Sequence, residues 1–343
     1  MQAIILAAGK STRTYPLTLT KPKPLLKAAN KTILEYNLGA IKDLVDELII
    51  VIGYKKNMIK KFVSKNYPNL NVKYVEQKEQ LGTAHALSIT EPFIKGRFIL
   101  MMGDDIYSKG NIKKCIKNRY SILTTKVKDP KNFGVIIEKN NLLVDFIEKP
   151  KKFISNLANT AFYSLDKQIF HYIKKIKKSK RKEFELPDAI KLLSKKEKIH
   201  IIKTKRWFPI GYPWDLLIAD KDLRSNKNLI GKNSKINGTI KNSTIGNNCI
   251  IDGKIKNSII MDNTLIEKGS IVENSIIGEN VYFNGKIISK NNVFSIVKNK
   301  KIKVNKLGAI IADNVKADNV VINPGCKIWP DKEIKGEVKK DIK

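Results

Sequence analysis

Two patterns of apolar positions divide the chain near residue 225. Before that point, apolar runs of strand length alternate with segments of helical length and pattern. Strands that alternate with helices predict an α/β domain with a mostly parallel sheet covered on both faces. We expect strands at residues 3–7, 48–53, 72–76, 98–103 and 122–127, and helices that include residues 33–42 and 83–89.

A hairpin and a closing helix complete this first region. The runs 134–139 and 142–148 are joined by Asn140-Asn141, and such a turn between two strand-like runs predicts a hairpin. Pro213 stands before an apolar stretch and predicts the start of a helix, because proline is favoured in the first helical turn. We expect this helix to close a domain of residues 1–225.

A repeat replaces this alternation in residues 226–343. Apolar residues recur there every five or six positions, with Gly and Asn between them, and three near-copies begin at Ile240, Ile255 and Val272. This spacing fits neither a helix nor an ordinary hairpin, and it predicts the hexapeptide repeats of a parallel β-helix. Residues 291–306 interrupt the repeat with asparagines and lysines and are expected to form a loop.

The charge of the chain is unusual, because it contains 66 Lys and Arg but only 32 Asp and Glu, for a net charge of +34. One interpretation is a nucleic-acid-binding protein, since such proteins neutralise phosphates. Only six of the cations are arginines, the lysines are spread along the whole chain, and no nucleic-acid-binding motif accompanies them. A lysine-rich surface is therefore the favoured interpretation and nucleic acid an improbable partner. The charge would still concentrate a phosphorylated substrate.

The cysteines and apolar runs predict a soluble, cytoplasmic protein. Three widely spaced cysteines without a CxxC pair exclude a disulfide framework and a Cys-based zinc site. The longest apolar runs have strand length, far below the roughly 20 residues of a membrane span. No basic region precedes the first apolar stretch, so we expect neither a signal peptide nor a membrane partner.

Small residues after the first strand suggest a phosphate-binding loop. Leu6, Ala8 and Gly9 lie where a strand leads directly into a turn, and backbone N–H groups there can approach phosphate oxygens closely. The spacing is neither that of a Walker A loop nor that of a Rossmann fingerprint. Arg13 and Lys23 follow, ten residues apart, and could clamp a triphosphate.

The whole string from Leu6 to Pro24 resembles the signature of the sugar-1-phosphate nucleotidylyltransferases, GxGTRxxPLTxxxPKP. The segment QKEQLGTAHA, residues 77–86, is similar to the base-reading segment of the N-acetylglucosamine-1-phosphate uridylyltransferases. The resemblance implies that Gln77 hydrogen-bonds the pyrimidine edge, with Gly82 and Thr83 beside the base. His85 is expected to be structural.

The same resemblance assigns a metal ligand and a sugar-phosphate site. It implies that Asp104, which follows a strand, binds the catalytic Mg²⁺. Lys149 would meet the sugar phosphate, and the remaining residues expected around the sugar are Gly134, Glu148 and Asn159.

Three positions depart from the family pattern. Ser11 replaces the second loop glycine, and Ala161 replaces the glycine of an NTG string. Pro209 stands where the family places a second metal ligand, and a proline side chain binds no metal. Either Asp215, six residues on, substitutes for that ligand, or the Mg²⁺ relies on Asp104, phosphates and water.

The resemblance implies that a sugar-1-phosphate attacks a nucleoside triphosphate and releases pyrophosphate. Our first choice is UTP with N-acetylglucosamine-1-phosphate or glucose-1-phosphate, followed by dTTP with glucose-1-phosphate and GTP with mannose-1-phosphate. The alternatives are a weakly active paralogue that binds nucleotide sugars and regulates a partner, and a polyanion-binding protein.

The resemblance also extends to the tail. It implies a Rossmann-like nucleotidyltransferase sheet followed by a left-handed β-helix. Some related tails are acetyltransferases with a histidine base, but all three histidines here (His85, His171 and His200) precede residue 226. We therefore expect the tail to serve oligomerisation or regulation, with a homotrimer favoured, and to affect assembly more than chemistry.

Overall fold

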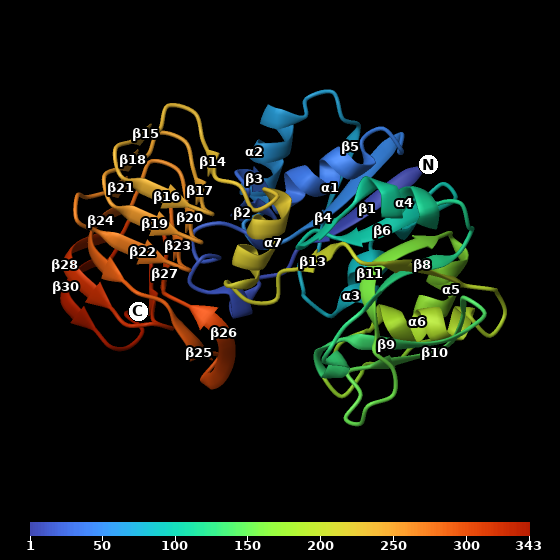
Figure 1. Ribbon diagram of the computed structural model, residues 1–343. Coiled ribbons are helices and arrows are strands. Elements are labelled where there is room, and N and C mark those ends of the chain that lie inside the picture. The colour runs from blue at the N-terminus through green and yellow to red at the C-terminus, as the bar shows by residue number, and fades with distance from the viewer. The chain divides into compact units, whose positions relative to one another are not determined.

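A nine-stranded mixed sheet organises the N-terminal region in the computed structural model, which describes residues 1–343 (Figure 1). In spatial order its strands are β5 (Val72–Glu76), β4 (Glu47–Ile52), β1 (Gln2–Ala7), β6 (Phe98–Met102), β11 (Leu157–Leu165), β8 (Ser121–Lys126), β12 (His200–Thr204), β10 (Leu142–Glu148) and β9 (Gly134–Lys139).

The four strands from β5 to β6 run parallel, and β11 then runs antiparallel to both β6 and β8. Every residue of β1 is buried, as the continuous apolar run of a strand covered on both faces predicts. The five expected strands agree with the observed ones to within one residue at each end. The expected hairpin is also confirmed, since β9 pairs antiparallel with β10 and both turn asparagines have positive φ.

Helices and short elements connect these strands. The helices are α1 (Ile33–Ile41), α2 (Lys56–Asn66), α3 (Thr83–Ser88), α4 (Lys109–Cys115), α5 (Gln168–Ile173), α6 (Leu186–Leu193) and α7 (Asp215–Leu223). A small antiparallel pair joins β7 (Asp105–Tyr107) to β13 (Trp207–Pro209). Helix α6 shows why these segments fold as they do, because Leu186, Ala189, Ile190 and Leu193 recur at helical spacing and are all buried.

The tail forms stacked coils of short parallel strands, as Figure 1 shows. One face consists of β14 (Leu229–Ile230), β17 (Thr244–Ile245), β20 (Ile259–Ile260), β23 (Ile276–Ile277), β27 (Ile310–Ile311) and β29 (Lys327–Ile328). The other strands are β15 (Lys235–Ile236), β16 (Thr239–Lys241), β18 (Ile250–Ile251), β19 (Lys254–Lys256), β21 (Leu265–Ile266), β22 (Ile271–Glu273), β24 (Tyr282–Ile287), β28 (Lys316–Ile322) and β30 (Glu333–Val338). This architecture confirms the predicted β-helix.

Inward aliphatic residues and asparagine corners explain the repeat. Ile245 pairs in register with Ile260, which pairs with Ile277, so each coil buries one aliphatic side chain above the last. At one corner Asn248 donates to Asn263, which donates to Asn280, and all three have positive φ. Asparagine tolerates this left-handed conformation, and its amide pairs with the next coil.

The expected loop at 291–306 is wrong. This segment is an antiparallel hairpin of β25 (Lys290–Val297) and β26 (Lys300–Leu307). The inward side of β25 is Val293, Ser295 and Val297, whereas its outward side carries the exposed Phe294 and Ile296. Apolar residues therefore lie on both faces, which hides the alternation of a strand.

By their contacts the residues form two compact units. The first comprises Met1–Lys10 and Leu34–Pro209. The second comprises Ile210–Lys343 together with Ser11–Ile33, which contains the 3₁₀ turns Thr12–Thr14 and Lys23–Leu25 and the short strands β2 (Lys27–Ala28) and β3 (Lys31–Thr32). Residues 11–33, which hold most of the signature and which we call the signature segment, thus group with the β-helix, whereas Leu6 to Lys10 belong to the first unit. In neither unit is a helix long and apolar enough to cross a membrane.

Candidate functional site

The carboxyl ends of the central parallel strands meet around Leu6 and Ala8. The Leu6 carbonyl accepts the N–H of Gly103 at 2.9 Å, and the Ala8 carbonyl accepts Gln80 Nε2 at 2.9 Å. Gly53 packs so closely that a Cβ atom there would lie 2.8 Å from the Ala8 oxygen. Open α/β sheets bind their ligands at this edge, so the expected loop through Leu6, Ala8 and Gly9 begins at the appropriate end of the sheet.

Gln77 is held by its own segment. Its side chain is buried, and its Nε2 lies 3.3 Å from the Gly82 carbonyl oxygen and 3.1 Å from His85 Nδ1. A carbonyl oxygen can only accept, so Nε2 is the amide atom that faces these groups. In this arrangement His85 Nδ1 is the acceptor, and the Gln77 oxygen Oε1 bonds neither of the two partners.

A close approach fixes the turn that follows Gln77. Gly82 has a φ of +106°, and a Cβ atom there would lie 2.5 Å from the carbonyl oxygen of Phe184. The adjacent Thr83 Oγ1 accepts the N–H of Leu186 at 3.1 Å. Any side chain at position 82 would push the segment out of place, which explains the glycine.

A buried asparagine donates hydrogen bonds to both sides of the turn that carries Asp104. Asn37, in α1, is fully buried and donates through Nδ2 to the carbonyl oxygens of Asp105 at 2.8 Å and Met102 at 3.3 Å. The half-buried Asp104 lies between these two residues. Sequence reasoning missed Asn37, although a polar residue within an apolar helical pattern was a usable signal.

Pro209 lies beside this turn. In the β7–β13 pair it is opposite Asp105, whose Oδ2 accepts Trp207 Nε1 at 3.1 Å. The strand that carries the family's second ligand position thus reaches the turn but supplies no carboxylate. No group of three or more metal-ligating side chains occurs in the molecule. One carboxylate oxygen donor suits Mg²⁺, which commonly uses one or two carboxylates plus substrate phosphates. Asp104 fits that pattern.

Three of the four residues expected around the sugar phosphate, Gly134, Glu148 and Lys149, form one group on β9 and at the end of β10. Gly134 is opposite Glu148, and a Cβ atom at Gly134 would lie 2.7 Å from Glu148 Oε2. Lys149 Nζ and Arg181 Nη2 lie 3.5 and 3.6 Å from Glu148 Oε1. Burial raises the pKa of Glu148, and these two cations partly offset the increase. Sequence reasoning missed Arg181, which no motif marks.

Asn159 is part of a strand irregularity in β11. Its Nδ2 donates to the Tyr163 hydroxyl at 2.7 Å and its Oδ1 accepts the N–H of Ala161 at 2.9 Å. The register of β11 against β8 shifts between Asn159 and Phe162. The side chain therefore supports its own bulge.

Both glycine replacements occupy left-handed backbone. Ser11 has a φ of 51° and Ala161 a φ of 57°. Glycine adopts this conformation freely, whereas a residue with a Cβ atom pays roughly 1–2 kcal/mol. Ser11 and Ala161 therefore carry backbone strain, and such strain is characteristic of functional sites.

The second unit brings Arg13, Lys23 and Asp215 into one electrostatic group. Asp215 Oδ2 accepts the N–H groups of Gly211 and Tyr212, each at 2.8 Å. Burial raises the pKa of Asp215 to about 6, although those hydrogen bonds and the charges of Lys23 and Arg13 act in the opposite direction.

An aromatic pair supports the arginine of this group. The Arg13 guanidinium lies over the Tyr212 ring, 5.7 Å from its centroid, and Tyr212 stacks on Trp214 at 5.0 Å. Tyr212 was not expected from the sequence.

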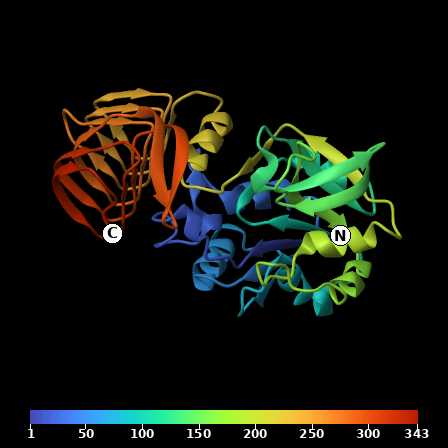
Figure 2. The same cartoon turned by 90° about the horizontal axis from the view of Figure 1, so that it is seen from below.

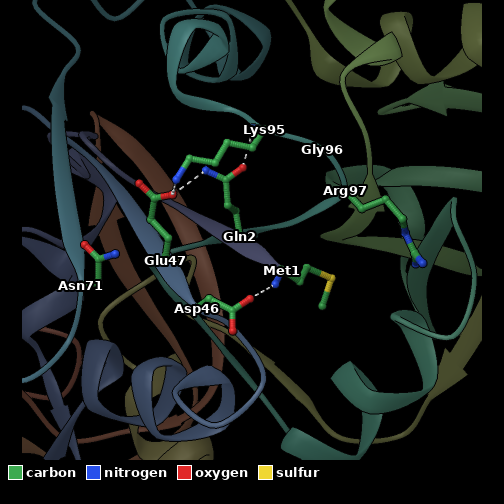
Figure 3. A pocket seen from close by; sticks show the side chains of 8 residues that line it. All are labelled: Met1, Gln2, Asp46, Glu47, Asn71, Lys95, Gly96 and Arg97. Carbon is green, nitrogen blue, oxygen red and sulfur yellow. Dashed lines mark hydrogen bonds and ion pairs between the residues drawn. The ribbon is translucent and has the colours of Figure 1, made fainter.

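A cavity of about 600 Å³ elsewhere in the first unit contains none of the expected site residues (Figure 3). Its lining residues include Gln2, Glu47 and Arg97, at or next to the amino ends of β1, β4 and β6. Glu47 accepts Gln2 Nε2 at 2.9 Å and pairs with Lys95 at 3.0 Å. Open α/β sheets bind their ligands at the carboxyl ends of the strands, so this cavity lies at the opposite end from the candidate site.

Comparison with known proteins bears on both regions. Residues 2–226 match the family model "Nucleotidyl transferase", and residues 221–342 match "GMPPB C-terminal domain". The chain is 35% identical over 378 aligned positions to the bifunctional protein GlmU of Methanocaldococcus jannaschii, with 96% of this chain and 92% of the relative covered.

Two further proteins resemble the N-terminal region. The UTP–glucose-1-phosphate uridylyltransferase AglF of Haloferax volcanii is 35% identical, covering 65% of this chain and 97% of that protein. A solved Bacillus anthracis structure, described as a glucose-1-phosphate thymidylyltransferase, superposes with a TM-score of 0.59 at 28% identity, covering 65% of this chain and 95% of that one.

Proposed function

The chain belongs to the nucleotidyl transferase family, as a sugar-1-phosphate nucleotidylyltransferase, and we propose that it joins UTP, or secondarily dTTP, to N-acetylglucosamine-1-phosphate or glucose-1-phosphate. In this reaction a phosphate oxygen of the sugar-1-phosphate forms a bond to the α-phosphorus. The bond from that phosphorus to the β-phosphate oxygen breaks, and pyrophosphate leaves. No nucleophilic side chain is needed.

We infer the preferred base from the orientation of the Gln77 amide. Uracil and thymine present an N3–H donor, whereas cytosine has an acceptor at that position. Because Gly82 and His85 engage the amide nitrogen, the amide oxygen Oε1 is the atom that Gln77 would offer to the base. An acceptor at this point bonds the N3–H of UTP or dTTP. With CTP it would face another acceptor, the cytosine N3, which would weaken binding by about 1–3 kcal/mol.

The cations divide between the two substrates. Arg13 and Lys23 would neutralise charge on the departing pyrophosphate, and Lys149 would hold the attacking phosphate. The reaction then depends on positioning and electrostatics, as phosphoryl-type transfers do. Asp104 would hold a Mg²⁺ ion, with Asp215 the second candidate, and the ion would stabilise charge on the phosphate oxygens.

A pyrophosphate-release assay tests the proposal. The panel pairs UTP, dTTP, GTP and CTP with N-acetylglucosamine-1-phosphate, glucose-1-phosphate and mannose-1-phosphate, with and without Mg²⁺. We expect the fastest release with UTP and one of the first two sugars. Release confined to GTP and mannose-1-phosphate would contradict the proposed substrates, and no release with any pair would contradict the proposed activity.

A weakly active paralogue that binds nucleotide sugars is the second candidate. Two observations favour it: Pro209 faces the Asp104 turn without a donor atom, and Ala161 strains the bulge beside Asn159. This candidate predicts that UDP-sugars stabilise the protein against heat while turnover stays low. Turnover of tens of molecules per second would exclude it.

We also propose assembly through the β-helix, with a trimer favoured. Apolar side chains on its surface support an interface, since Phe294, Ile288 and Val321 are each about half exposed. Light scattering coupled to size-exclusion chromatography measures the mass directly, and a monomer at micromolar concentration would contradict the proposal.

A further inference from the structure

Buried ion pairs join the signature segment to the coils of the β-helix, within the second unit. Lys21 Nζ lies 2.9 Å from Glu279 Oε1 and 2.9 Å from Asp313 Oδ2. The Lys21 and Asp313 side chains are each only 8% exposed. The neighbouring Thr20 hydroxyl donates to Asp313 Oδ2 at 2.6 Å. A lysine charge so far from water is stable only because two carboxylates face it.

Further contacts fix the second half of the segment. Lys27 pairs with Asp262, and Asn30 Nδ2 donates to the carbonyl oxygen of Ile245 at 2.7 Å. The N–H of Ala29 donates to Asp220 Oδ1 at 2.8 Å, in α7. The residues that contact this single stretch thus lie in or just after four neighbouring strands, β17, β20, β23 and β27, and in α7. Figure 2 shows the stacked coils from below.

The three carboxylates occupy equivalent places in the repeat, which we call the acidic corner: Asp262, Glu279 and Asp313. Each follows the last residue of a stacked strand by two positions, after β20, β23 and β27. The coils are also linked there, because Asp313 Oδ1 accepts the N–H of Glu279 at 2.8 Å. Stacked like charges repel each other, so the corner requires cations between its members. Lys21 and Lys27 supply them.

We propose that the acidic corner positions the segment carrying Arg13 and Lys23, so that the β-helix takes part in transfer as a positioning element. This inference rests on the proposed function, which gives Arg13 and Lys23 their roles. Lys21 and Lys23 are separated by Pro22 and followed by Pro24, and proline fixes φ at both steps. Displacement of Lys21 is thus transmitted to Lys23, and a shift of about 1 Å can cost about a hundredfold in rate.

The test uses the full-length protein with Asp313→Asn, Glu279→Gln and the double variant. Asparagine at 313 can still accept the N–H of Glu279, so the coil contact is retained while the charge facing Lys21 is lost. We expect kcat to fall by about tenfold in each single variant and further in the double, while the KM for the triphosphate changes less than about threefold. Asp318→Asn is the matched control, since Asp318 bonds Asn284 and lies 3.9 Å from Lys335 on the same β-helix.

Hydrogen–deuterium exchange provides a second readout that does not depend on activity. Peptides covering residues 11–33 should exchange faster in the double variant and remain unchanged in the Asp318→Asn control, with melting curves showing that the protein is folded. A folded double variant with unchanged kcat, from an active wild type, would overturn the inference and leave the proposed function intact. A wild type inactive with every substrate pair would instead overturn the proposed function. In that case unchanged exchange in the double variant would refute the anchoring as well.

Discussion

The base-reading segment and the signature segment reach their geometry in opposite ways. Gln77 takes its orientation from a partner eight residues away, and the whole arrangement lies within one stretch of chain. Thr20, beside Lys21, takes its orientation from Asp313, which lies 293 residues away. The proposed base-selecting residue is thus held by local contacts, whereas the segment that carries the proposed phosphate-binding cations contacts distant coils.

This difference predicts how each segment responds when one of its contacts is removed. A local hydrogen bond costs about 1 kcal/mol when lost, so the base-reading segment should fail gradually. Breaking a buried ion pair costs about 3–5 kcal/mol, because one charge is left without a partner. The signature segment should therefore lose order abruptly when its carboxylates are removed.

The largest expected effect is at Asp220. Its carboxylate is almost fully buried, accepts the N–H of Ala29, and pairs with Arg224 at 2.7 Å. We expect Asp220→Ala to lower the free energy of unfolding by about 3–5 kcal/mol, since the buried Arg224 loses its partner. Chemical denaturation measures the change, with the exposed Lys221→Ala as control. Equal stability of the two variants would show that this contact does not anchor the segment.

The next largest expected effect is the loss of turnover when a charged residue of the proposed active site is removed. We predict that Lys23→Ala and Asp104→Ala each lower turnover at least about a hundredfold, which is the scale of one lost transition-state contact. The pyrophosphate-release rate measures this, and the exposed Lys31→Ala in the same segment should retain the wild-type rate. Wild-type turnover in either alanine variant at 23 or 104 would place the site elsewhere.

The sequence predicts the strands and the local motifs of the first unit well, for a physical reason. Strands such as β1 and β4 are short, almost uniformly apolar runs, because nearly all of their residues are buried in the sheet. The hairpin at 290–307 was missed because apolar residues lie on both faces of β25, including the exposed Phe294 and Ile296, and because lysines interrupt the apolar positions of β26.

The partners of Lys21 could not be found from spacing. Nothing local to Lys21 indicates Glu279 or Asp313, because β-helix coils bring together residues that are hundreds of positions apart. The repeat held one usable signal. An acidic residue recurs two positions after the inward isoleucines Ile260, Ile277 and Ile311, in a chain with few acids.

The buried Asp215 in the second unit should make the stability of the protein depend on pH. Its pKa is raised from 3.8 to about 6, so the folded protein binds more protons than the unfolded chain between those values. Stability should therefore fall as pH rises through that window, and ionised Asp215 destabilises the fold above it. We expect Asp215→Asn to raise the free energy of unfolding by about 3 kcal/mol at pH 8 and to change it little at pH 4. Parallel stability profiles from pH 4 to pH 8 would contradict this assignment.

The smallest expected effect is at His85, where the locally built segment can be perturbed by one hydrogen bond. His85→Leu removes the acceptor that faces Gln77 Nε2, so the amide is free to turn and offer its nitrogen to the base. We expect the KM for UTP to rise about five- to tenfold and the preference for UTP over CTP to shrink by a similar factor, as loss of one neutral hydrogen bond implies. His85→Asn is the matched control, because its side-chain oxygen can accept in place of Nδ1 and should preserve most of the preference. Steady-state kinetics with both triphosphates measure the ratio. If His85→Leu retains the wild-type ratio, the orientation of Gln77 is set by Gly82 alone, and the base-reading segment is even more local than the contact with His85 suggests.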